Sequence, residues 1–105
     1  MNILFDQGTP VPLRRFLSGH TVVTAFERGW STLKNGDLIR EAEAAEFDVL
    51  VTTDSNLKYQ QQVRGRAIGI VVLMSTSWPK IQGKIPAVVT GVETVGRGGY
   101  LEIQI

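Results

Sequence analysis

The chain contains no cysteine and only one histidine, His20, among its 105 residues. The absence of cysteine excludes disulfides, thiolate metal sites and cysteine nucleophiles, and it is compatible with a reducing compartment. No histidine-rich metal site or histidine-based proton relay can form without His20, which we expect to be structural. These absences leave oxygen-bearing side chains as the main candidates for chemistry.

The chain also lacks a long apolar run and a dominant sign of charge. No apolar stretch approaches the ~20 residues of a membrane span, and the N-terminus lacks the basic-then-apolar layout of a signal peptide. The 11 basic and 10 acidic side chains give a net charge of +1, which does not by itself indicate a nucleic-acid-binding protein. We expect one small domain, residues 1–105, in the cytoplasm.

Short continuous apolar runs recur along the chain, and such runs are typical of strands buried on both faces of a sheet. The expected strands are residues 2–5, 21–24, 49–51 and 67–73, with an alternating edge strand at 100–105. Segments of helical spacing lie between them. Strands that alternate with helices predict an α/β fold with an open, mostly parallel sheet covered on both faces.

The helical segments carry their own start and stop signals. Thr9 is expected to cap a first helix that ends at Gly19 and buries Leu13, Phe16 and Leu17. The other expected helices are residues 35–46, a short polar helix at 56–62 and a region at 78–95 interrupted near 83–86, with a basic turn at 63–66. Trp30, in a connector, is expected to cover the core, and base stacking is its alternative role.

Two of the expected strands are each followed by an aspartate. Asp6 follows the run 2–5 directly, and Asp54 comes just after the run 49–51. Ligands of open parallel sheets bind beyond the carboxyl ends of the strands. Thr52 lies two residues before Asp54, so its hydroxyl and the carboxylate can face the same side. If these strands are neighbours, the two carboxylates should repel each other unless a cation lies between them or one is protonated.

A third acid, Asp37, lies in the first turn of the helix expected at 35–46. Taken alone it would be a residue that stabilises the helix dipole. Three carboxylates on one rim suit a hard cation, Mg²⁺ or Mn²⁺, that binds phosphate oxygens. Such a site can activate water and steady the leaving oxygen of a phosphodiester, so the reaction class indicated is hydrolysis.

Three stretches together resemble the small PIN-like proteins that are related to VapC toxins. They are residues 2–7 (NILFDQ), the segment from Gly29-Trp30 to residues 34–37 (KNGD), and residues 49–57 (VLVTTDSNL). The resemblance implies a three-layer α/β/α fold with a mostly parallel sheet and metal-dependent cleavage of single-stranded RNA. It makes Asp6, Asp37 and Asp54 the catalytic and metal-binding acids. It also implies a toxin of a toxin–antitoxin pair, with a small antitoxin partner and a homodimer.

The same resemblance assigns supporting roles. Thr52 matches the threonine of the family's Thr-x-Asp signature, and a fourth acid usually follows that signature. Asn56 stands in that neighbourhood here, and Glu41 is the other candidate. The candidate contacts to the RNA backbone, which should make affinity depend on salt, are Arg14, Arg15, Lys34, Lys58, Arg64 and Arg66.

Two other classes compete with the nuclease. Receiver domains of response regulators also bind Mg²⁺ through acids after their strands, but here Asp6 is followed by Gln7 and Gly8 rather than by a second acid, and no lysine ends the last strands. A non-catalytic module would keep the fold as an interaction surface for a small partner protein. Metal binding separates that module from the enzyme.

Overall fold

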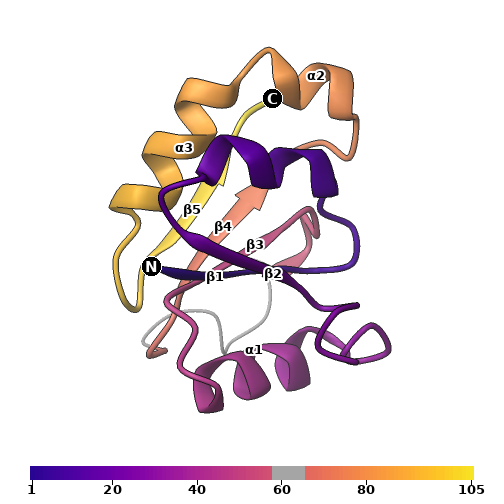
Figure 1. Ribbon diagram of the computed structural model, residues 1–105, viewed down its shortest axis with the longest axis vertical. Helices are drawn as coiled ribbons and strands as arrows, with labels where there is room; N and C mark the ends of the chain where they lie inside the picture. The colour runs from indigo at the N-terminus through magenta and orange to yellow at the C-terminus, as the bar shows by residue number, and fades with distance from the viewer. Residues whose placement is uncertain (58–65) are drawn as a thin grey trace.

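The computed structural model of the protein describes residues 1–57 and 66–105 (Figure 1). Five strands alternate with short helices in these ranges. The strands are β1 (Asn2–Phe5), β2 (Thr21–Thr24), β3 (Val49–Thr52), β4 (Gly69–Leu73) and β5 (Tyr100–Ile103). The helices are the 3₁₀ helix η1 (Val11–Leu17) and the α-helices α1 (Asn35–Ala44), α2 (Trp78–Gln82) and α3 (Ile85–Thr94).

All the strands run parallel in one sheet of order β2-β1-β3-β4-β5. The register places Phe5 of β1 beside Thr24 of β2 on one side and Val51 of β3 on the other. This arrangement confirms the α/β fold and the strands expected from the apolar runs. In this doubly wound order the chain reverses its direction of winding between β1 and β3.

Helices cover both faces of the sheet, as Figure 1 shows with α1 on one side and η1, α2 and α3 on the other. Successive strand residues point to opposite faces, so Ile3 and Phe5 of β1 pack under η1 and α3, while Leu4 packs with α1. Each face therefore has its own apolar core. β3 and β4 are buried along their whole length, which explains their continuous apolar sequences.

The first helix differs from the prediction. It is a 3₁₀ helix that begins at Val11, and Thr9 does not cap it through a side-chain hydrogen bond. Pro10 and Pro12 supply no backbone N–H, which favours a short, tight turn over a regular α-helix. Leu13 and Leu17 are buried as expected, but Phe16 is 39% exposed. Its ring lies at the margin of the core, 6.1 Å from that of Trp78.

The later helical region is split as predicted. α2 ends at Gln82 and α3 begins at Ile85, because Pro86 cannot donate a backbone hydrogen bond to a continuous helix. The expected polar helix at 56–62 and the basic turn at 63–66 fall mainly on residues 58–65, outside the described residues. None of the described helices has the length and apolarity needed to cross a bilayer.

Candidate carboxylate site at the ends of strands β1 and β3

The site lies where β1 and β3 end side by side, at the point where the winding of the sheet reverses. Parallel sheets of this kind leave a crevice there, because the connections from the two strands leave in opposite directions. Asp6 directly follows β1, and its backbone N–H donates to the carbonyl oxygen of Val51 at 3.0 Å. Thr52 is the last residue of β3, and Asp54 follows two positions later.

The Asp6 carboxylate is held by donors from its own turn. The backbone N–H of Gly8 lies 3.1 Å from Oδ1, and the hydroxyl of Thr9 lies 2.8 Å from the same oxygen. The Thr9 hydroxyl is also 2.9 Å from the carbonyl oxygen of Val51, so its single proton is shared between two acceptors. The turn is closed by the N–H of Thr9 donating to the carbonyl oxygen of Asp6. These bonds fix the carboxylate before any ligand arrives.

Thr52 connects the two strand ends. Its hydroxyl donates to Oδ2 of Asp6 and accepts the backbone N–H of Asp54 at 3.1 Å. The side chain is only 1% exposed, so both bonds are shielded from water. The sequence predicts that the Thr52 hydroxyl and the Asp54 carboxylate share one site. In the structure the hydroxyl contacts the backbone N–H of Asp54 and the carboxylate of Asp6.

The loop after β3 is shaped around Asp54. Its Oδ1 accepts the backbone N–H of Asn56 at 2.9 Å, and its carbonyl oxygen accepts the N–H of Leu57 at 3.2 Å. An aspartate that bonds a backbone N–H two residues on makes an Asx turn. Asn56 thus supports the site through its backbone, a role different from that of a fourth metal-binding acid.

Burial raises the pKa of the Asp6 carboxyl, although its hydrogen bonds from the two threonine hydroxyls and from Gly8 and Thr9 act to lower it. The expected repulsion from Asp54 is not among the causes of the shift. No basic side chain in the described part of the chain pairs with Asp6. The ionised form is therefore left without a compensating charge, which a bound cation would supply.

The Asp6 carboxylate has room for one further contact. A carboxylate has about four lone-pair positions. Donors in the described chain occupy two on Oδ1 of Asp6 and one on Oδ2, so one position on Oδ2 remains. Mg²⁺ in proteins is commonly held by one or two carboxylates together with waters and substrate phosphates. Asp6, together with Asp54 in the neighbouring loop, would be the carboxylates to hold such an ion.

The third expected acid does not join them in this conformation. Among residues 1–57 and 66–105, no three histidine, cysteine, aspartate or glutamate side chains lie close enough together to hold a metal ion. Asp37 lies in the first turn of α1, and its side chain is 55% exposed and bonded to Arg40. Glu41, the other candidate, is exposed on the same helix. α1 does begin near the end of the sheet where β1 and β2 terminate (Figure 1).

Of the basic candidates for RNA contact, two are paired with glutamates, two are exposed, and two lie outside the described residues. Arg66 is not available, because its Nε lies 2.9 Å from Glu43 Oε1 and the pair is largely buried. Burial acts to raise the pKa of Glu43, but bonds from Arg66 and from the N–H of Ala67 outweigh it and lower the pKa. Arg14 pairs with Glu27. Arg15 and Lys34 are exposed, while Lys58 and Arg64 lie outside the described residues.

Sequence reasoning missed Thr9 and Gly8. Thr9 was assigned to a helix cap, yet its hydroxyl contacts Asp6, three residues earlier. Gly8 approaches the loop after β3 so closely that a Cβ there would lie 2.6 Å from Thr53 Oγ1. The available signal was the spacing Asp-x-Gly-Thr immediately after a buried strand, which favours an Asx turn as well as a cap.

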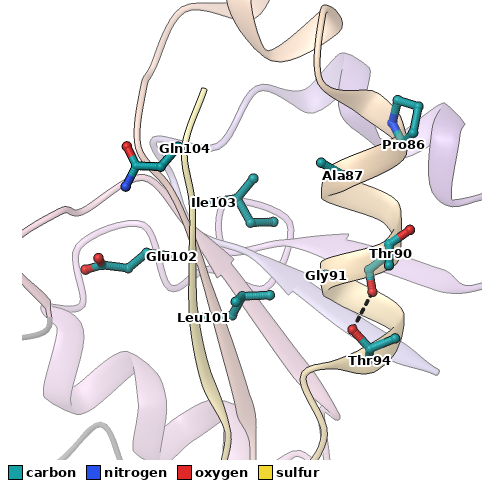
Figure 2. Close-up of a pocket in the computed structure, with 9 residues that line it drawn as sticks. All are labelled: Pro86, Ala87, Thr90, Gly91, Thr94, Leu101, Glu102, Ile103 and Gln104. Atoms are coloured by element: carbon teal, nitrogen blue, oxygen red, sulfur yellow. Dashed lines mark hydrogen bonds between the residues drawn. The ribbon is translucent and has the colours of Figure 1, made fainter.

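A groove also lies at the β5 edge of the sheet, away from the ends of β1 and β3. This groove of about 590 Å³ lies between α3 and the edge strand β5. Figure 2 shows Leu101 and Ile103 pointing into the groove toward α3, while Glu102 and Gln104 point away from it. Gly91 lets the helix approach the strand, since a Cβ there would lie 2.7 Å from Ile103 Cδ1.

Comparison with known proteins adds no relative: no family model, no curated protein and no solved structure matches this chain. The resemblance to PIN-like proteins therefore rests on its sequence motifs, and the function must be argued from the site itself.

Proposed function

We propose that the protein is a metal-dependent endoribonuclease that hydrolyses phosphodiesters of single-stranded RNA. The observation that carries this proposal is the pairing of Asp6 with Thr52 and the Asp54 loop where β1 and β3 end. A partly buried carboxylate with a raised pKa and no basic partner among the described residues is a common feature of functional sites. The receiver-domain alternative is weaker, because the loop after β1 carries one acid instead of two.

The chain's own residues would act as positioning groups and ligands. Thr9, Gly8 and Thr52 hold the Asp6 carboxylate in one orientation, and the Asx turn does the same for Asp54. Asp6 and Asp54 would hold Mg²⁺ or Mn²⁺, which supplies activation of water and stabilisation of the leaving oxygen. The exposed Arg15 and Lys34 would attract the RNA backbone.

Asp37 enters this proposal as a ligand that must first leave Arg40. The two side chains are three residues apart on α1 and more than half exposed, and surface pairs of this kind contribute little to stability. Exchange of Arg40 for a metal or its water ligands would therefore cost little. Removing Asp37 should weaken metal binding less than removing Asp6 or Asp54.

Cleavage of a labelled single-stranded RNA in Mn²⁺ tests the proposal. We expect Asp54→Asn to abolish cleavage and to weaken Mn²⁺ binding in a calorimetric titration. Asp48→Asn is the matched control, because Asp48 precedes the same strand and accepts the backbone N–H of Asn2 at 2.7 Å, a bond that asparagine can keep. Equal cleavage by wild type and Asp54→Asn would overturn the assignment.

The alternative function is a non-catalytic module bound by a small partner protein. It is favoured by the groove between α3 and β5, since β5 is an edge strand of the described sheet. A small antitoxin would add an extended segment to this edge, using backbone hydrogen bonds for affinity. Absence of Mn²⁺ binding, with loss of partner binding in Leu101→Arg, would favour the module. Sedimentation of the protein alone would reveal pairing between two copies instead.

A further inference from the structure

A separate pocket of about 320 Å³ opens beside Asp6, where η1 passes over the ends of β1 and β2. Its walls come from the loop after β1, from η1 and from the loop after β2. Among the lining residues are Asp6, Arg14, Thr24 and Phe26. A volume of this size falls at the small end of ligand pockets. The pocket and the carboxylate site share Asp6, so a molecule bound at one would lie next to the other.

Phe26 lines this pocket, and its side chain is 77% exposed, more than any other large apolar side chain of the described residues. The turn that carries it is fixed internally. Thr24 donates its N–H to Glu27 Oε1 at 2.9 Å and accepts the N–H of Glu27 at 3.1 Å, and Gly29 donates to the carbonyl oxygen of Phe26 at 3.0 Å. The exposed aromatic ring is therefore presented by a bonded turn.

Polar side chains line the rest of the pocket, among them Gln7 and Arg14. Arg14 places Nη2 2.9 Å and Nη1 3.3 Å from the two carboxylate oxygens of Glu27. This fork leaves Nε of Arg14 buried and without a hydrogen-bond partner among the described residues. Because Nε has no surface open to solvent, the group that a ligand in the pocket would reach is the Gln7 amide, which offers both a donor and an acceptor.

We propose that this pocket binds one unstacked base of a single-stranded RNA, next to the phosphate that reaches Asp6 and Asp54. The position of the neighbouring RNA phosphate at Asp6 and Asp54 rests on the proposed nuclease function. A nucleobase combines a flat π face for Phe26 with edge donors and acceptors for the Gln7 amide, and single-stranded RNA is generally recognised through such stacking and edge contacts. An apolar side chain of a protein partner would cover Phe26 but offer no hydrogen-bonding group to the Gln7 amide.

The test uses small probes and no divalent metal, so that it does not depend on cleavage. Amide chemical shifts of the protein are followed during titration with UMP or AMP, and in parallel with ribose 5-phosphate, which lacks the base. We expect the nucleotides to shift the amides of Thr24, Phe26 and Glu27, and the sugar phosphate to leave them in place. Phe26→Ala should weaken nucleotide binding about tenfold, while Phe26→Trp should retain it.

Phe16→Ala is the matched control, because Phe16 is also partly exposed but packs against Trp78 instead of lining the pocket. Equal binding by wild type and Phe26→Ala, or equal shifts with ribose 5-phosphate, would overturn the base pocket. Shifts caused by N-acetyl-leucinamide but by no nucleotide would overturn it in favour of a protein side chain. Base binding by a protein that cleaves no RNA would support the pocket and refute the nuclease.

Discussion

Two regions of this small domain, the carboxylate site and the groove between α3 and β5, are built on different principles. The site at β1 and β3 consists of short loops whose polar side chains are fixed by hydrogen bonds, with Thr52 and Thr9 both buried. The groove between α3 and β5 consists of regular elements whose side chains meet by shape, with Gly91 against Ile103. We therefore expect cleavage to be sensitive to the loss of single polar atoms at the carboxylate site. We expect stability to be sensitive to added side-chain volume at the groove.

The largest expected effect is at Thr52. Replacement by valine keeps the shape but removes the hydroxyl that serves both Asp6 and Asp54. We expect RNA cleavage to fall roughly 100-fold, because misplacement of about an ångström has that effect on a positioned group. Stability should fall by about 1–3 kcal/mol through the unpaired N–H and carboxylate oxygen. Single-turnover cleavage and urea unfolding measure the two effects, and Thr52→Ser should restore both.

The second prediction concerns the groove. Gly91→Leu places a side chain where Ile103 Cδ1 and Leu101 Cδ2 already lie, so we expect a loss of about 1–3 kcal/mol in unfolding free energy. Cleavage per folded molecule should not change. A fall in cleavage by a variant that remains folded would show that the groove and the carboxylate site are coupled, and would contradict their independence.

The third prediction uses the raised pKa of Asp6. In the folded state this carboxyl holds its proton to a higher pH than in the unfolded chain, so its contribution to stability is present at low pH and is lost as pH rises through the folded pKa. Glu27 and Glu43, whose pKa values are lowered, act in the opposite sense. Both glutamates are present in wild type and in Asp6→Asn, so the difference in unfolding free energy between the two proteins removes their contributions.

We therefore expect the unfolding free energy of wild type, measured relative to Asp6→Asn in urea, to fall as the pH is raised from about 4 toward neutrality. Mn²⁺ should reverse part of this fall in wild type and not in the variant, because a ligand that binds only the folded state stabilises it. A relative stability that is constant with pH would contradict the burial effect at Asp6.

The smallest expected effect is on the salt dependence of RNA binding, in which Arg15 and Arg66 should differ. Arg15 is exposed, so Arg15→Ala should reduce the slope of log binding constant against log salt concentration by about 1 if it contacts a phosphate. Arg66 is committed to Glu43, so Arg66→Ala should leave the slope unchanged and lower stability. Fluorescence anisotropy with a labelled RNA measures both slopes. Identical slopes for wild type and Arg15→Ala would remove Arg15 from the interface.

Much of the fold could be predicted because its signals are local. The apolar run before Asp6 and the run before Asp54 each identify a buried strand, and parallel strands bring their ends to one rim. Thr52 could be placed for the same reason. The role of Thr9 could not, since a threonine before proline favours a helix cap, and only the contact of its hydroxyl with Asp6 shows that it belongs to the site.

The pocket beside Asp6 was beyond prediction for a different reason. A phenylalanine in a sequence is usually a core residue, and nothing local to Phe26 tells that its turn faces outward. Trp30, considered as an alternative stacking platform, instead packs over the core with its ring 6.1 Å from that of Phe47. Which aromatic ring is exposed depends on how the loop after β2 meets η1, through the bond between Glu27 and Arg14, and this contact joins two separate elements.

The bond between Thr52 and Asp6 joins residues 46 positions apart. A chain emerging from the ribosome can pair β1 with β2 early, but it cannot complete this site until β3 has inserted beside β1. The proposed activity would therefore be withheld from every incomplete fragment that ends before Asp54. A proteolytic cut between β2 and β3 that lets β3 detach would break up the proposed site as completely as loss of an acid, even though every site residue remained in the preparation.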